Sequence, residues 1–334
     1  MVDSKLDTLQ YISTPHMIEG YELIENKLNL VERLLLDVQP DQHSLITDAA
    51  QELIKAGGKR IRAAICLLSA GIFEADPEIS LALAAGIEML HTATLVHDDI
   101  IDESVIRRGK PTLNAKRDPK LSVLIGDYFF ARAANLVAET DNLDIMKQFS
   151  ATLMTILNGE VDQQFTRWQL DRQGYTKRIY AKTGAMFVLA AKSAAILGDA
   201  TPQEILALEN YGHFTGIAFQ VVDDILDFTS EQTRLGKPVG GDLREGIFTL
   251  PVLLYADRYP QDPDLKLLLK VQDGNHPAVG RLINSIRRSG IIDDALGEAK
   301  ELVSRGQLAL TELPQSQFTE ALYSMGNTVV ERVT

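Results

Sequence analysis

Residues 79–102 read ISLALAAGIEMLHTATLVHDDIID, and this stretch decides the fold. Its first part, 79–96, is the most apolar segment of the chain, but Glu88 and His91 interrupt it. A membrane span needs about 20 almost uninterrupted apolar residues, so we expect no transmembrane segment here and predict a buried helix instead. Three aspartates follow at the end of this helix, which brings carboxylates next to a hydrophobic core.

The rest of the chain shows the same helical pattern. Apolar residues recur every three or four positions, and alternating strand patterns closed by Asn-Gly or Asp-Gly are absent from the sequence. Thr201, Pro202 and Glu204 have the order expected of a helix N-terminus. We therefore predict an all-α fold, a single large helical bundle.

No long polar linker divides the chain into halves. We predict one domain over residues 1–334, with residues 1–40 as an N-terminal helical region and residues 260–334 as C-terminal helices of the same domain. Breaks between helices are expected near Gly57-Gly58, at 109–111, 171–174, 198–202 and 236–246, and over the Pro/Asp/Gly-rich stretch 260–277.

The charge balance excludes several functions. The 334 residues contain 33 Lys and Arg against 46 Asp and Glu, a formal net charge of −13. Nucleic-acid binding and polybasic membrane anchoring both need clustered cations, so we expect neither. Cys66 is the only cysteine, which excludes an internal disulfide, and residues 1–30 contain no signal or transit pattern. We therefore expect a cytoplasmic protein.

An acidic motif occurs twice, in LVHDDIID at 95–102 and VVDDILD at 221–227. In each copy the first and last aspartates are four residues apart, so a helix places them on one face about one turn apart. Like charges at this spacing repel, and flanking apolar residues make an unneutralised charge costlier. Oxygen-only ligands favour Mg²⁺ completed by substrate phosphates. The alternative for one copy, a solvated acidic turn, loses weight because the motif is repeated.

Cations stand near these acids in the sequence. Arg107 and Arg108 follow the first motif, and GGKRIR at 57–62 carries Lys59 and Arg62 three residues apart, which we expect to share a helix face. Clustered Lys and Arg suit phosphate groups. A helix cap and surface ion pairs are the alternatives for each cluster alone. Together with the acids they predict a diphosphate site.

Ordered blocks of the chain resemble the trans-isoprenyl (polyprenyl) diphosphate synthases, most of all the medium- and long-chain enzymes. These blocks are GGKRIR at 57–62, HTATLVHDDIIDESVIRRGKPT at 91–112, GDYFFARA at 126–133, NGEVDQQ at 158–164, YAKTGAMF at 180–187 and the run from GIAFQVVDDILD to TLPV at 216–252. The resemblance implies a bundle around a deep central cavity, a homodimer, and condensation of isopentenyl diphosphate with an allylic prenyl diphosphate.

The resemblance also implies roles for individual residues. Mg²⁺ ions that bridge the allylic diphosphate would be held by Asp98, Asp102, Asp223 and Asp227, with Asp224 beside them. The allylic diphosphate would contact Arg107, Lys182 and Lys237, and isopentenyl diphosphate would contact Lys59, Arg62, His91 and Arg108. Thr183 and Gln220 would place oxygens near the carbon that becomes cationic. Outside the matched blocks, His91 would be an ordinary core histidine, and Thr183 and Gln220 ordinary interhelical hydrogen-bonding residues.

Product length would be set on the helix before the first motif. Ala93 and Thr94 are small where short-chain enzymes carry aromatic residues, which favours a product longer than farnesyl; Met89 and Leu90 are candidates for the cavity floor. Ile247 stands where many relatives have Lys. The alternatives are a geranylgeranyl or farnesyl diphosphate synthase and a non-catalytic subunit of a heteromeric synthase.

Overall fold

The computed structural model describes residues 20–37, 43–107, 109–229 and 239–332. Its N-terminal half contains η1 (Tyr21–Leu23), α1 (Glu25–Leu36), α2 (Ser44–Lys55), α3 (Ile61–Ile72), α4 (Pro77–Ile101), β1 (Ile106–Arg107), β2 (Lys110–Pro111), α5 (Leu113–Lys116), α6 (Pro119–Ala138) and α7 (Leu143–Phe165). Its C-terminal half contains α8 (Arg172–Ile179), η2 (Tyr180–Gly184), α9 (Ala185–Leu197), α10 (Pro202–Thr229), α12 (Gly241–Arg244), α13 (Leu250–Arg258), α14 (Pro263–Val271), α15 (Ala278–Arg288), α16 (Ile291–Ala309), η3 (Leu310–Glu312) and α17 (Gln317–Glu331). The prediction of an all-α fold is confirmed.

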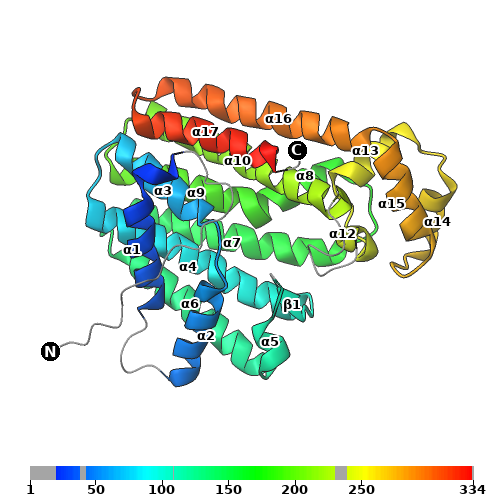
Figure 1. The fold of residues 1–334 in the computed structure, drawn as a ribbon, viewed down its shortest axis with the longest axis horizontal. Coiled ribbons are helices and arrows are strands. Elements are labelled where there is room, and N and C mark those ends of the chain that lie inside the picture. Colours follow the sequence, from blue (N-terminus) through cyan, green and yellow to red (C-terminus); the bar gives the residue numbers. More distant parts are fainter. Residues whose placement is uncertain (1–19, 38–42, 108, 230–238, 333–334) are drawn as a thin grey trace.

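The two helices that carry the acidic motifs, α4 and α10, run through the bundle (Figure 1). Helix α4 begins at a strong cap, because the side chain of Asp76 accepts hydrogen bonds from the backbone of Glu78 and Ile79 and Pro77 occupies the first turn. It packs along α6, while α10 packs against α9 and α16. Both acidic motifs therefore lie near the C-terminal ends of long, well-packed helices.

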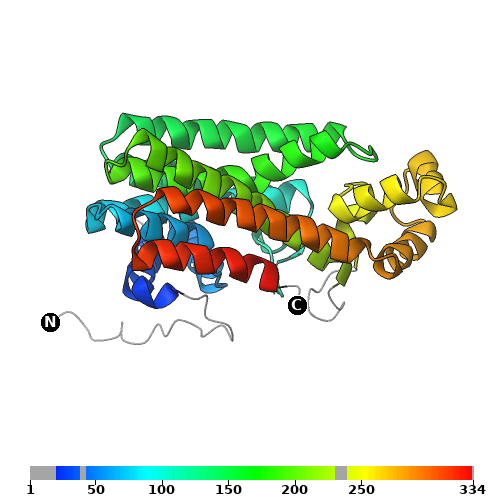
Figure 2. The ribbon, with the colours of Figure 1, turned by 90° about the horizontal axis from the view of Figure 1, so that it is seen from above.

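Two hydrophobic clusters fill the interior. The first joins α1–α4, α6, α7 and α9, and the second surrounds the C-terminal half of α10 with α13, α15 and α16; Phe219 packs against both. Viewed from above, α16 and α17 lie side by side, and α13–α15 extend beyond the bundle at the end where α16 begins (Figure 2). The single-domain boundary 1–334 stays a prediction, and parts of 1–40 lie outside the described residues.

One local prediction was wrong, and one confirmed break contains a hairpin that was not expected. The stretch 260–277 is not a continuous break, because Asp262 caps α14 by accepting a hydrogen bond from the backbone of Leu265 (2.9 Å) and Pro263 begins the helix. The expected break at 109–111 contains a short antiparallel hairpin, in which Arg107 pairs with Lys110 across Gly109, whose φ is +72°. Proline and glycine lie where the long helices are interrupted. The capping and pairing residues beside them determined whether a short helix or a hairpin formed there.

Two described helices, α4 and α6, have the length and composition of a membrane span, with mean hydropathy of 1.6 and 1.3 over their most apolar windows. The α4 window is 78% buried inside the bundle, as in the core helix of a globular protein. The α6 window is only 39% buried, so this helix leaves apolar surface exposed.

Candidate active site

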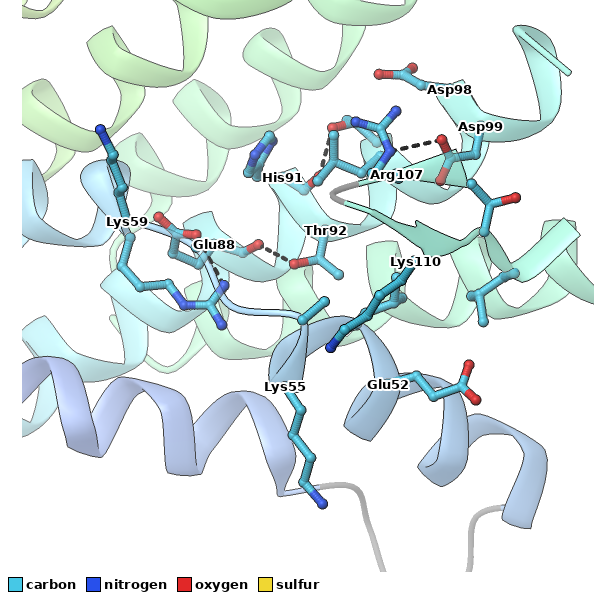
Figure 3. Close-up of a pocket in the computed structure, with 18 of the residues that line it drawn as sticks. Glu52, Lys55, Lys59, Glu88, His91, Thr92, Asp98, Asp99, Arg107 and Lys110 are labelled. Atoms are coloured by element: carbon cyan, nitrogen blue, oxygen red, sulfur yellow. Dashed lines mark hydrogen bonds and ion pairs between the residues drawn. The ribbon is translucent and has the colours of Figure 1, made fainter. Parts of the chain in front are cut away.

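A cavity of about 1040 Å³ opens between α2, the start of α3, α4, the hairpin, η2 and α10. In Figure 3, Lys59, Glu88 and His91 lie on one side of this cavity, and Asp98, Asp99 and Arg107 lie on the other. Most of the residues that we predicted from the sequence line it: Lys59, Arg62, His91, Thr94, Asp98, Asp102, Arg107, Lys182, Thr183, Gln220 and Asp223. Segments far apart in the sequence therefore meet at one place.

The first acidic motif forms the edge of the cavity where α4 ends. The backbone N–H of Asp102 donates to the carbonyl of Asp98 (2.8 Å), so the two side chains project about one helical turn apart, as predicted. Burial raises the pKa of Asp98 to about 6, although the ammonium of Lys182 opposes this change. A partly buried carboxylate with a raised pKa is a group that gains from a bound cation.

Asp99, between these two acids, has a different role. It is buried, and its Oδ1 accepts a hydrogen bond from Nε of Arg107 at 2.7 Å (Figure 3). The amide of Asn114 donates to the carbonyl oxygen of Asp99 (3.0 Å), which ties the hairpin and α5 to the end of α4. Asp99 therefore holds the guanidinium of Arg107 at the cavity wall.

Lys182 approaches the first motif from the opposite wall. It belongs to η2, a π-helical turn between α8 and α9, and its Nζ lies 3.3 Å from Oε1 of Glu160 on α7. Burial lowers the pKa of Lys182, but the carboxylates of Glu160, Asp98 and other nearby acids outweigh burial, and the net pKa is raised. The ammonium thus stays charged beside the acids. Ile247 is buried and does not line the cavity.

The three aspartates of the second acidic motif, Asp223, Asp224 and Asp227, lie in three different environments. Asp223 lines the cavity, and its Oδ1 accepts a hydrogen bond from Nη2 of Arg332 (2.7 Å), just after α17. The guanidinium of Arg332 also stacks 4.6 Å from the ring centroid of Phe219. Burial raises the pKa of Asp223, and the charge of Arg332 opposes that rise. A cation therefore already lies at the carboxylate that we predicted to bind metal.

Asp224 turns away from the cavity into a hydrogen-bonded chain. The Tyr175 hydroxyl donates to Oδ2 of Asp224 (2.7 Å), and the Gln220 amide donates to Oδ1 (2.9 Å). The Thr183 hydroxyl in turn donates to Oε1 of Gln220 (2.6 Å). Burial and then the charge of Asp242 raise the pKa of Asp224 well above its ordinary value. Asp224 therefore fixes the orientation of Gln220, and metal binding by Asp224 stays a prediction.

Asp227 also lies off the cavity wall. Its carboxylate accepts hydrogen bonds from the backbone N–H groups of Gly241 (3.1 Å) and Asp242 (3.3 Å) at the start of α12. Burial, followed by the charge of Asp227, raises the pKa of Asp242 to about 7. Metal binding by Asp227 stays a prediction as well.

Lys59 and Arg62 both line the cavity, but not as two residues on one helix face. Helix α3 begins at Ile61, so Lys59 precedes it, and the expectation of a shared helix face was wrong. The turn uses a positive φ at Gly57 (+78°) and again at Arg60 (+48°). Burial and the charge of Arg332 lower the pKa of Lys59, while Asp223 opposes them. Arg108 and Lys237 lie outside the described residues.

Comparison with known proteins agrees with this geometry. A family model described as polyprenyl synthetase matches residues 43–286, most of the chain. The chain belongs to the polyprenyl synthetase family. Among curated members, it is 39% identical over 295 residues to an all-trans-nonaprenyl-diphosphate synthase (geranyl-diphosphate specific) of Rhodobacter capsulatus, covering 87% of this chain and 90% of that one. It is 34% identical over 331 residues to an octaprenyl diphosphate synthase of Haemophilus influenzae, covering 98% and 97%.

A solved structure of the family superimposes closely on this one. The polyprenyl synthase of Caulobacter crescentus, complexed with calcium and isoprenyl diphosphate, has a TM-score of 0.88 and 32% identity over 96% of this chain and all of its own. The helices that build the cavity therefore follow the arrangement of a family member.

The four candidate chain-length residues of this polyprenyl synthetase lie in two environments. Thr94 lines the cavity, whereas Met89, Leu90 and Ala93 are at most 1% exposed and pack in the first hydrophobic cluster. Helical periodicity explains the difference, because residues 91, 94, 95 and 98 share the cavity face of α4. A role for the three core residues stays a prediction.

The sequence did not point to two residues of the site. Arg332 is isolated near the C-terminus, and only the packing of α17 on α3, α10 and α16 brings it to Asp223. Tyr175 lies outside the matched blocks and reaches Asp224 across 49 positions of sequence. Spacings of three or four residues identify neighbours on one helix. They contain no information about contacts between helices, such as those of Arg332 and Tyr175.

The donor chemistry fits a hard divalent cation. Asp98, Asp102 and Asp223 offer oxygen ligands to one cavity, and no group of three or more His, Cys, Asp or Glu among the described residues forms a metal site by itself. Such a partial shell suits Mg²⁺, which keeps water and substrate phosphate oxygens among its ligands.

Proposed function

We propose that this protein is a trans-prenyltransferase that joins isopentenyl diphosphate to an allylic diphosphate and releases a medium-to-long-chain all-trans polyprenyl diphosphate and pyrophosphate. One observation supports this most strongly: acids from both motif helices share one cavity with cations from the start of α3, the hairpin and η2. Carboxylates that bind a metal and cations that bind phosphate are together what a diphosphate substrate requires.

We assign the metal as Mg²⁺, bound by Asp98 and Asp102 on one wall and Asp223 on the other. Calcium and isoprenyl diphosphate in the Caulobacter structure support a divalent cation with this substrate class. When bound, Mg²⁺ supplies positive charge that stabilises the departing diphosphate. Oδ1 of Asp223 accepts a hydrogen bond from Arg332 (2.7 Å), so a metal ion bound by this carboxylate would lie beside that guanidinium.

The two diphosphates are assigned to different cations. Arg107 and Lys182 lie near Asp98 and would bind the allylic diphosphate, while Lys59, Arg62 and His91 would bind isopentenyl diphosphate. Arg108 and Lys237 belong to these two sets by resemblance. Holding both substrates in one cavity converts a reaction between two molecules into a local one.

The reaction then breaks the allylic carbon–oxygen bond, whose electron pair leaves with pyrophosphate. The double bond of isopentenyl diphosphate attacks the allylic cation, and loss of a proton regenerates an allylic product. Hydrogen bonds that run from Tyr175 through Asp224 orient the side chains of Gln220 and Thr183. The Gln220 oxygen is held toward Thr183. Water must be kept from the cation, since it would trap it.

Elongation by the purified protein tests this proposal. With Mg²⁺, isopentenyl diphosphate and farnesyl or geranylgeranyl diphosphate, chromatography against prenyl standards should show products longer than geranylgeranyl. Products that stop at farnesyl or geranylgeranyl would overturn the assigned length and favour the short-chain alternative. Absence of elongation with any allylic primer would favour a non-catalytic subunit of a heteromeric synthase.

We also propose a homodimer that covers the exposed apolar surface of α6 and α7. On α7, Met154, Leu157, Val161 and Phe165 are each at least 49% exposed at helical spacing, and on α6 Leu124 is 63% exposed. An apolar surface of this kind is typical of an interface. Leu124→Glu should shift the mass measured by light scattering from dimer to monomer. Leu308→Glu, the same change at an exposed position on α16, should leave the mass unchanged. A wild-type monomer would refute the proposal.

A further inference from the structure

Arg60 lies between Lys59 and Arg62 in the sequence and also borders the cavity, but its guanidinium is enclosed by other side chains. It is only 7% exposed, although Arg is rarely buried without partners. Its backbone adopts φ +48° and ψ +37°, a left-handed conformation that costs a non-glycine residue free energy. A strained backbone and a buried charge persist only where surrounding contacts compensate for them.

The guanidinium of Arg60 makes those contacts with three helices. Its Nε donates to Oε1 of Glu32 on α1 (3.1 Å), and its Nη2 donates to the carbonyl of Ile54 on α2 (3.2 Å). Its Nη1 lies 3.9 Å from Oε2 of Glu88 on α4. The rigid fork of guanidinium donors suits this arrangement, which the point charge of Lys cannot reproduce.

Glu88 continues the same network to the start of α3. It is 2% exposed, and its Oε1 accepts a hydrogen bond from the backbone N–H of Ala63 (3.1 Å), one of the first N–H groups of that helix, which have no partner within it. On the other side of Arg60, the Tyr21 hydroxyl donates to the carbonyl of Lys59 (2.7 Å). Residues 59–63 are thus fixed from both sides.

We propose that Arg60 is a positioning residue for isopentenyl diphosphate: with Glu32 and Glu88 it holds the 59–62 turn so that Lys59 and Arg62 face the cavity. Arg60 also neutralises Glu88, which lines that same cavity. Without Arg60, the Glu88 carboxylate would compete with the diphosphate for the two cations. The inference rests on the proposed function, because it takes isopentenyl diphosphate as the ligand of Lys59 and Arg62.

The test compares Arg60→Gln with Arg33→Gln, which removes the same charge from an exposed position on α1. Arg60→Gln should raise the Kd for isopentenyl diphosphate, measured by calorimetry without allylic substrate, and its KM by about tenfold or more, the effect of losing one charge-assisted contact. The KM for the allylic substrate should stay within about twofold, because the contacts of the two substrates are separate and their effects are independent. Arg33→Gln should leave both KM values unchanged.

Two further variants keep the test decisive if Arg60→Gln folds poorly. Arg60→Lys restores the charge without the fork and should give an intermediate KM for isopentenyl diphosphate. Glu32→Gln removes one partly exposed partner and should change the same KM in the same direction. A fall in melting temperature with both KM values unchanged, or an equal rise in both, would overturn the inference. A wild-type protein that neither binds isopentenyl diphosphate nor elongates would overturn the proposed function itself.

Discussion

Replacing Tyr175 with Phe should affect both stability and catalysis. The substitution removes only the hydroxyl that donates to Oδ2 of Asp224 at 2.7 Å in a fully buried setting. A buried hydrogen bond contributes about 1 kcal/mol, and a buried acceptor left without its donor costs about 1–3 kcal/mol. We therefore expect the free energy of unfolding to fall by about 2 kcal/mol.

The catalytic effect follows from the chain of contacts. Asp224 loses one of its two side-chain anchors, so the amide of Gln220 and the hydroxyl of Thr183 lose a fixed orientation. Misplacement of positioning groups by about 1 Å can cost a hundredfold in rate, and we expect kcat for elongation to fall by about tenfold or more. Denaturant unfolding and steady-state elongation measure the two effects on the same preparation.

Tyr211→Phe is the matched control. The Tyr211 hydroxyl is also fully buried and donates over 2.7 Å, but to the backbone carbonyl of Leu322 on α17 and away from the cavity network. Its loss should cost about 1 kcal/mol and leave kcat unchanged. Equal kcat values for the Tyr175→Phe and Tyr211→Phe proteins would refute the reasoning, because the cavity network would then have no catalytic role.

The remaining predictions concern the first acidic motif and α4. Asp98→Ala should lower kcat/KM by more than about a hundredfold through loss of a metal ligand, while the exposed Asp144→Ala should not; near-normal turnover by Asp98→Ala would remove its assigned role. In the ligand-free protein, the pKa of Asp98 rises from 3.8 to about 6 on folding, so the free energy of unfolding should fall as pH rises from about 4 to about 6. Unfolding titrations of Asp98→Asn should show a flatter pH dependence over this range. Thr94→Phe should shorten the product, as seen by chromatography, whereas Ala93→Phe should mainly overpack the core and cost about 1–3 kcal/mol; an unchanged product from Thr94→Phe would place the floor elsewhere.

Local chemistry made part of the fold predictable. The start of α10 is an example: Thr201 and Glu204 exchange hydrogen bonds, with the Thr201 N–H 2.7 Å from Oε2 of Glu204 and the Glu204 N–H 3.4 Å from Oγ1 of Thr201. Every participant lies within four residues, so the sequence contains the whole signal. The hairpin around Gly109 was missed because a strand of two residues has no period to detect.

The candidate site was predictable to the extent that its residues lie in the repeated motifs and their basic neighbours. Asp98, Asp102 and Asp223 line the cavity as expected. The different orientation of Asp224 could not be predicted, because Tyr175 comes from another helix and the choice between cavity and core depends on tertiary packing. The same holds for Arg332, whose partner is 109 residues away.

The order in which the chain is synthesised determines when the ion pair between Arg332 and Asp223 can form. A ribosome makes Arg332 109 residues after Asp223, so the acidic end of α10 is complete before this ion-pair partner exists. Until α17 packs, the partly exposed carboxylate of Asp223 lacks its shortest ion-pair contact. Removal of Arg332 from the finished protein by proteolysis would recreate that state and change the charge at the cavity.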